Sequence, residues 1–221
     1  MGAKILTVAN QKGGAGKTTL AMQLAGTLGR QGDRVLVIDA DPQGTAQRWA
    51  ASAEEAAPFP AAVAGLAAAG GKVHQEARKY AGDYDYLVVD CPPAVDSPVP
   101  QSALMIADLA LVPVIPSPAD LWAAKGIQRL IENAQDFNEA LAARLVLNML
   151  QPNTALGREA EDLLADFGIP RLGQTLGLRQ AYRQSQLYGA TVHALDRQAK
   201  AVAEVDALAS EVRNVVEVGG W

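Results

Sequence analysis

Cysteine and histidine are scarce in this chain of 221 residues, which has one cysteine and two histidines. A single cysteine excludes an intrachain disulfide framework and makes the cytosol the default location. The sequence also lacks a run of about 18 apolar residues, which argues against a transmembrane helix. Its N-terminus enters an apolar run directly, without the basic and apolar regions of a signal peptide, so we expect a cytoplasmic protein.

Positive charge is also in short supply. The formal net charge is −5 and the pI is about 5.1, which does not favour nucleic-acid binding by the chain as a whole. The segment 167–203 departs from this balance, because it contains five basic residues and one acidic residue. This segment is either a solvated helical surface or a phosphate-binding surface that a dimer would double. The candidate DNA contacts within it are Arg179, Arg183, Arg197 and Lys200.

Short apolar runs alternate with amphipathic stretches along the chain. The runs that predict strands are residues 5–9, 35–38, 86–89, 109–114 and 145–150. The stretches that predict helices are residues 18–30, 44–55, 73–81, 99–107, 119–137, 155–167 and 196–216. This alternation predicts an α/β fold, with right-handed crossovers and a mostly parallel, twisted sheet that helices cover on both faces.

The domain organisation follows from the same pattern. No internal repeat interrupts the chain, and the weakly patterned segment 50–71 predicts a short helix, a loop and a variable surface segment. We therefore expect one domain over residues 1–217 and a loose C-terminal tail over residues 218–221.

The most informative motif is Lys-Gly-Gly-Ala-Gly-Lys-Thr-Thr at residues 12–19. It lies between a predicted strand and a predicted helix, where glycine N–H groups and a helix N-terminus can surround phosphate oxygens. Lys17 would reach the β- and γ-phosphates, and the Thr18 hydroxyl would bind Mg²⁺. The predicted nucleotide-binding residues of this loop are Lys12, Gly13, Gly14, Ala15, Gly16, Lys17, Thr18 and Thr19.

The loop departs from the common P-loop pattern, because Gln11 stands where the first glycine is expected and a second lysine, Lys12, follows it. In this it resembles the deviant Walker A box of the ParA/MinD family of dimerising ATPases. The resemblance implies a single-domain P-loop fold, ATP and Mg²⁺ as cofactors, and a homodimer that forms with ATP. It also implies that Lys12 touches the nucleotide of the partner subunit, while Lys17 binds the phosphates of its own subunit. Lys12 and Lys17 are therefore both predicted catalytic residues.

Two carboxylates, Asp39 and Asp41, follow the second predicted strand in the sequence Asp-Ala-Asp-Pro-Gln-Gly. Acidic oxygens suit Mg²⁺ and the orientation of an attacking water. Asp41 could instead cap the helix that begins near Gln43. The segment resembles the D-x-D-P-Q box of the family, which implies that Asp39 supports the Mg²⁺ shell and that Asp41 positions the hydrolytic water.

The third predicted strand ends in Asp90-Cys91-Pro92-Pro93. Four apolar residues followed by an aspartate form a Walker B strand, so Asp90 is a predicted Mg²⁺ contact. The Pro-Pro pair resembles a switch segment of the family. We expect Cys91 to be a small buried side chain rather than a nucleophile, because neither histidine lies in a motif that could activate it.

Two further segments resemble the family. The run Val-Pro-Val-Ile-Pro-Ser-Pro at residues 112–118 resembles a segment of the small ParF-like partition proteins, where it lies near the nucleotide, and it implies a contact from Pro116. Its prolines could also simply end the strand. Asn148 matches an asparagine that often contacts adenine, although it could be a turn residue. The segment 179–192 resembles the late R-x-x-Y…G-x-(S/T)-V pattern.

The resemblance covers residues 3–216, and two features select a branch. One cysteine argues against the cluster-carrying members of the family, and the last helix lacks the basic face of a membrane-targeting helix. We therefore expect a ParA-type partition ATPase that does not bind membranes. Its slow hydrolysis would be stimulated by a ParB/ParG-like centromere-binding or cargo adaptor. It would bind non-specific DNA on the nucleoid and move a plasmid, a chromosome origin or a protein cargo. The alternative is a MinD-like membrane- or client-positioning switch.

Overall fold

The computed structural model describes residues 2–93, 97–151, 154 and 168–218, and its centre is a six-stranded parallel sheet. The strands are β1 (Lys4–Val8), β2 (Val35–Asp39), β3 (Ala62–Gly65), β4 (Tyr86–Asp90), β5 (Leu109–Val114) and β6 (Ala142–Leu147). Their order in the sheet is β3-β2-β4-β1-β5-β6. The predicted α/β fold with a parallel sheet is thus confirmed.

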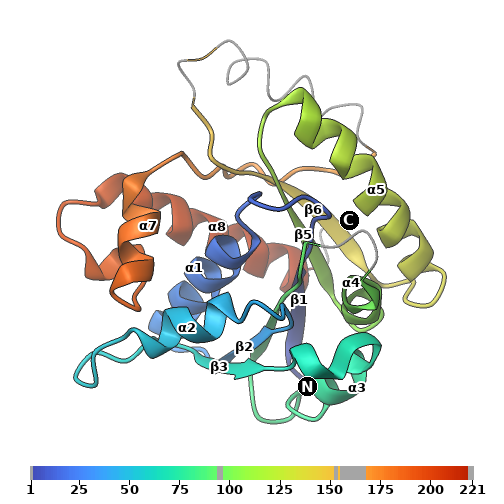
Figure 1. The fold of residues 1–221 in the computed structure, drawn as a ribbon, viewed down its shortest axis with the longest axis horizontal. Helices are drawn as coiled ribbons and strands as arrows, with labels where there is room; N and C mark the ends of the chain where they lie inside the picture. The colour runs from blue at the N-terminus through green and yellow to red at the C-terminus, as the bar shows by residue number, and fades with distance from the viewer. Residues whose placement is uncertain (1, 94–96, 152–153, 155–167, 219–221) are drawn as a thin grey trace.

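Helices cover both faces of the sheet (Figure 1). The helices α1 (Lys17–Arg30), α2 (Thr45–Ala51), α7 (Gln180–Leu187) and α8 (Ala199–Val218) lie on one face. The helices α3 (Val73–Arg78), α4 (Pro98–Leu104) and α5 (Pro118–Gln135) lie on the other. Burial on both faces explains why the central strands are continuous apolar runs, as in β5, where all six residues are buried.

The C-terminal helix α8 is part of the core. Its apolar side chains pack beside α1; the buried ones are Ala201, Val205, Leu208, Ala209 and Val212. Near its end, Arg213 forms an ion pair with Asp33 at 2.7 Å and lies 5.6 Å from the ring centre of Tyr86. Among the described residues, no helix has both the length and the apolar character needed to cross a membrane.

Some predictions about the elements were wrong. The segment 50–71 contains the edge strand β3, which pairs with β2, and not only a helix and loops. The helix α7 was not predicted. Helix α8 begins at Ala199 and ends at Val218, so it includes the first residue of the predicted tail; the other three lie outside the described residues. The helix predicted over residues 155–167 lies outside the described residues.

Candidate functional site

The sheet brings three predicted site segments to one edge. In the parallel register, Asp39 of β2 is paired with Asp90 of β4, and Asp90 is paired with Val8 of β1. The glycine-rich loop leaves β1 directly after this point. Because β2, β4 and β1 are neighbours, both aspartates and the loop meet beyond the carboxyl ends of the strands, where ligands bind in such sheets.

Two glycines give the loop its shape. Gly14 and Gly16 have φ angles of 78° and 86°, in the left-handed region that L side chains rarely adopt. Gly16 precedes the first turn of α1, and a β-carbon there would overlap the Asn148 side-chain amide. The loop can therefore close tightly over the N-terminus of α1, which is the geometry that receives a phosphate group.

Lys17 points back into the loop. Its side-chain nitrogen donates to the Lys12 carbonyl at 3.1 Å, and the residue is only 6% exposed. Burial lowers the pKa of Lys17, against the opposing charges of Asp90 and Asp41. Nζ is therefore held against the backbone of the loop, at the Lys12 carbonyl.

The start of the loop is anchored by Asn10, which the sequence interpretation overlooked. The Asn10 side chain is buried, donates to the Pro113 carbonyl at 2.7 Å and accepts from the Lys12 N–H at 3.1 Å. This contact ties Lys12 to the end of β5. The sequence signal for this role of Asn10 was its position, as a polar residue between a buried strand and Lys12.

The two carboxylates after β2 have different surroundings. Asp39 is fully buried and accepts from the N–H groups of Gln47 at 3.0 Å and Asp41 at 3.2 Å. Burial raises the pKa of Asp39 in spite of these hydrogen bonds. Asp41 accepts from the Gln43 N–H at 2.8 Å, but α2 begins only at Thr45, with Gly44 as its cap. The alternative interpretation of Asp41 as a helix cap is therefore wrong.

The surroundings of the Asp90 carboxylate show whether the site fits Mg²⁺. It is almost completely buried, and burial raises its pKa to about 7 although it accepts a hydrogen bond from Thr18. Its Oδ1 has no hydrogen-bond partner within the described residues. A buried carboxylate oxygen without a partner, next to a threonine hydroxyl and a second aspartate, fits a hydrated Mg²⁺ ion.

Thr18, Asp39 and Asp90 are the residues that would hold Mg²⁺, directly or through water. In the described part of the chain, no three His, Cys, Asp or Glu side chains form a closed metal cluster. Mg²⁺ usually keeps several waters and takes few protein ligands. When bound, the ion would neutralise charge on the phosphates, while Lys17 and the loop N–H groups position them.

A cavity of about 280 Å³ continues from the loop toward α7. Its lining residues are Gly14, Gly16, Thr19, Asn148, Met149, Gly177, Leu178, Arg179, Tyr182, Arg183 and Gln186. The Asn148 amide donates to the Ala15 carbonyl and accepts from the Met149 N–H, both at 2.9 Å. Asn148 therefore holds the loop, and its predicted contact with adenine stays a prediction, as does that of Pro116, which is not among the lining residues.

The basic segment is less uniform than its sequence indicates. Arg179 makes a two-point ion pair with Glu204, at 2.9 Å from Nε and 2.5 Å from Nη2. Glu204 lies just beyond the segment 167–203, so the charge count missed it. Arg183, Arg197 and Lys200 are exposed. Cys91, as predicted, is buried, and burial raises the pKa of its thiol, which disfavours the nucleophilic thiolate.

Glu204 also accepts hydrogen bonds from the Tyr182 hydroxyl at 2.8 Å and the Gly177 N–H at 3.2 Å. Burial opposes ionisation of this carboxyl, but the donors together outweigh it and lower its pKa. Ionised Glu204 therefore stabilises the fold above the ordinary carboxyl pKa, and this stabilisation is lost as the pH falls through the lower, folded-state value.

Replacing Glu204 by Gln should lower the free energy of unfolding by about 2 kcal/mol at pH 7, because charged acceptors make the stronger hydrogen bonds. The difference from wild type should shrink as the pH falls below about 4. Urea unfolding across this pH range measures it, with the exposed Glu139→Gln as the control. A loss of stability that is independent of pH would contradict this role of the charge.

These features define a P-loop nucleotide-binding domain of the α/β class. The model of the CobQ/CobB/MinD/ParA nucleotide binding domain matches residues 6–192. The chain is 35% identical over 210 residues to the maintenance of carboxysome distribution protein A of Halothiobacillus neapolitanus, covering 94% of this chain and 95% of that protein. The chain therefore belongs to the CobQ/CobB/MinD/ParA family, and it is an ATPase of the ParA/MinD type.

Two further similarities agree with this assignment. The chain is 32% identical over 195 residues to the chromosome-partitioning ATPase Soj of Thermus thermophilus, covering 74% of this chain and 76% of that protein. The septum site-determining protein MinD of Pyrococcus horikoshii, solved with Mg-ADP, superposes with a TM-score of 0.76 at 20% identity and 98% coverage of both chains. The predicted cofactors, ATP and Mg²⁺, are consistent with that fold.

Proposed function

We propose that the chain is a ParA-type positioning ATPase that dimerises with MgATP, binds DNA without sequence preference and hydrolyses ATP slowly. The observation that supports this most directly is the second lysine, Lys12, at the start of the P-loop. The Lys17 side chain already lies against the backbone of the loop, so a second cation at residue 12 is useful if the nucleotide site of another protomer faces it. We infer that two protomers meet across their nucleotides.

The proposed partner is an adaptor of the ParB/ParG type that stimulates hydrolysis and links the ATPase to its cargo. The similarity to a carboxysome distribution protein makes a protein assembly one candidate for that cargo, beside a plasmid or a chromosome origin. Asp41 is proposed to position the attacking water. Asp41 is partly exposed, and its carboxylate accepts a hydrogen bond from the backbone N–H of Gln43 at 2.8 Å.

DNA rather than a membrane is the proposed surface. The last helix buries its apolar residues in the core, so they are not available to enter a lipid interface. Three exposed cations remain near α7 and the start of α8, namely Arg183, Arg197 and Lys200. Two copies of this set in a dimer would provide about twice as many phosphate contacts, which would place the protein on the nucleoid within the cytoplasm.

Charge reversal at Arg183 or Lys200 should weaken ATP-dependent DNA binding equally for unrelated sequences and should reduce its salt dependence. Each reversal removes about one phosphate contact per protomer, so the slope of log affinity against log salt should fall by roughly 1–2 for a dimer. Fluorescence anisotropy with labelled duplex DNA measures this, and the exposed Lys72→Glu is the matched control.

The result also separates the two candidate functions. Equal salt slopes for wild type and both reversals would place the DNA surface elsewhere on the chain. An absence of DNA binding with ATP, combined with ATP-dependent flotation on anionic vesicles, would overturn the DNA proposal in favour of a MinD-like switch.

A further inference from the structure

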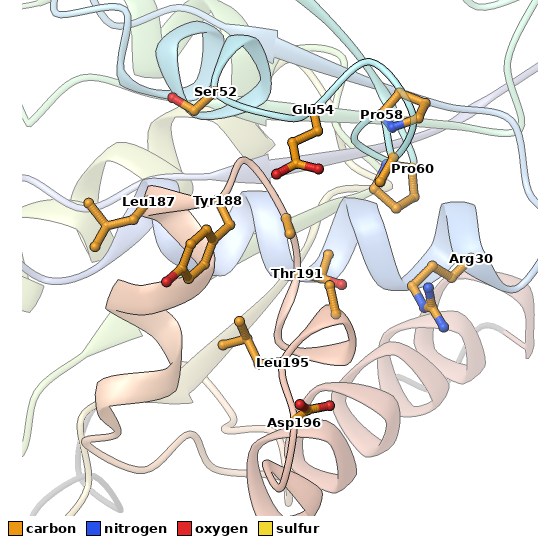
Figure 2. Close-up of a pocket in the computed structure, with 13 residues that line it drawn as sticks. Arg30, Ser52, Glu54, Pro58, Pro60, Leu187, Tyr188, Thr191, Leu195 and Asp196 are labelled. Atoms are coloured by element: carbon orange, nitrogen blue, oxygen red, sulfur yellow. The ribbon is translucent and has the colours of Figure 1, made fainter.

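A groove lies beside α7 and shares no lining residue with the cavity next to the P-loop. Its volume is about 670 Å³. Two chain segments form it, the one that follows α2 (within residues 52–60) and the one that begins at the last residue of α7 (within residues 187–196), and Arg30 at the end of α1 completes it. Figure 2 shows these two segments and the side chains that they direct into the groove.

The walls of the groove are fixed by buried contacts. The Trp49 indole N–H donates to the Ala190 carbonyl, and the Val192 N–H donates to the buried Gln23 side chain, both at 3.0 Å. Gly189 has a φ of 59°, and a β-carbon there would overlap the backbone of Ala53. The two segments therefore touch directly, and a ligand would meet a groove that needs little ordering.

Large apolar side chains are exposed at one end of the groove. Leu187 is 75% exposed and its neighbour Tyr188 is 62% exposed. Leu195 lines the groove near them, whereas Pro58 lies beside Pro60, away from Leu187 and Tyr188, as Figure 2 shows. Single exposed apolar residues are common, but an aromatic and two leucines around one concave surface are typical of an interaction site, and tyrosine is a frequent anchor of binding energy.

The charges of the groove favour a basic ligand. Glu54 comes from one segment and Asp196 from the other, and Arg30 is the one cation among the lining residues described. None of these three side chains forms an ion pair within the described part of the chain. Two unpaired carboxylates against one guanidinium complement a basic side chain better than an acidic one.

The polar lining also favours a peptide over a small polar metabolite. Thr191 is the buried polar residue of the lining, and its hydroxyl is already paired with His193 at 3.2 Å. Small-molecule sites use buried polar groups that converge on the ligand to fix its orientation. This groove instead offers exposed apolar side chains and charges at its edges, which suit an extended segment with one apolar and one basic residue.

We propose that this groove binds a short extended peptide of a partner protein. The peptide has a large apolar side chain that contacts Leu187 and Tyr188, and a basic side chain that pairs with Glu54 or with Asp196. The proposal depends neither on DNA binding nor on dimerisation.

Selection of a random 12-residue peptide library on the full-length protein tests it. Selected peptides, labelled with fluorescein, are then titrated with wild type and variants by fluorescence anisotropy. We expect the selected peptides to combine an apolar and a basic residue. Tyr188→Ser and the double variant Glu54→Lys, Asp196→Lys should each weaken binding by about tenfold or more.

Phe137→Ser is the matched control, because Phe137 is 77% exposed and lies outside the groove. It should leave peptide affinity unchanged, and ATP hydrolysis should be the same in all these variants and in wild type, which shows that they are folded. Equal weakening by Phe137→Ser, or selection of acidic peptides, would overturn the proposal. So would nucleotide-independent self-association of wild type in sedimentation that Tyr188→Ser abolishes, because a second copy would then cover the groove.

Discussion

Replacing Lys17 by Gln should abolish ATP hydrolysis, with a loss of at least about 100-fold in the rate of phosphate release. The side-chain nitrogen of Lys17 lies inside the loop, on the Lys12 carbonyl at 3.1 Å. Phosphate oxygens entering the loop would meet this ammonium. Glutamine keeps most of the side-chain length and can still donate a hydrogen bond, but it cannot neutralise the charge that develops during phosphoryl transfer.

The measurement is phosphate release at saturating MgATP, with the exposed Lys72→Gln as the control for a lost lysine charge. Without nucleotide, the unfolding temperatures of all three proteins should be similar, because glutamine can keep the hydrogen bond from residue 17 to the Lys12 carbonyl. Hydrolysis at the wild-type rate by Lys17→Gln would show that the P-loop assignment of the catalytic site is wrong.

The site was predictable from sequence where residues of suitable chemistry directly follow or end a predicted strand. The glycine-rich loop follows one apolar run, and the two aspartates end two other runs. These three strand ends meet when the strands are parallel neighbours in one sheet. The register shows this directly, since Asp39 and Asp90 are paired residues of adjacent strands. A strand that is buried on both faces of the sheet is a continuous apolar run, which is easy to see in the sequence. For this reason five of the six strands were predicted.

The elements that the sequence did not reveal depend on distant contacts. β3 is a short edge strand whose side chains are partly exposed, so it has no long apolar run and is defined only by its pairing with β2. Helix α7 is polar, and it buries little beyond Ala181, Tyr182 and Ser185. Ser185 contacts Gln23, which is 162 positions away in sequence. No local pattern encodes such a contact.

The roles of single residues were missed for a related reason. Asn10 acts through a carbonyl of β5, and Arg179 is held by Glu204, so both depend on partners far along the chain. A charge count over a sequence window treated Arg179 as available to DNA. Its bidentate pair with a carboxylate leaves Arg183, Arg197 and Lys200 as the better candidates.

Replacing Lys12 by Gln should leave nucleotide binding largely intact and prevent dimerisation with ATP. The Lys12 backbone forms part of the loop, through its N–H to Asn10 and its carbonyl to Lys17, and a side-chain substitution preserves both contacts. What it removes is a positive charge at the mouth of the loop. If that charge serves the nucleotide of the facing subunit, its loss weakens the dimer and not the site itself.

Asp41→Ala should have the opposite effect. Asp41 is partly exposed and its carboxylate accepts from the backbone N–H of Gln43, so the variant should fold and bind MgATP, but without a group to orient the attacking water it should accumulate as a dimer. Light scattering on a size-exclusion column, with ATP and with ADP, measures the mass of each protein. We expect wild type to form a dimer with ATP only, Asp41→Ala to retain its dimer for longer, and Lys12→Gln to remain monomeric. If all three proteins had the same mass with ATP and with ADP, the model of two protomers that share their nucleotide sites would be wrong. Assembly would then depend neither on the charge of Lys12 nor on unhydrolysed ATP.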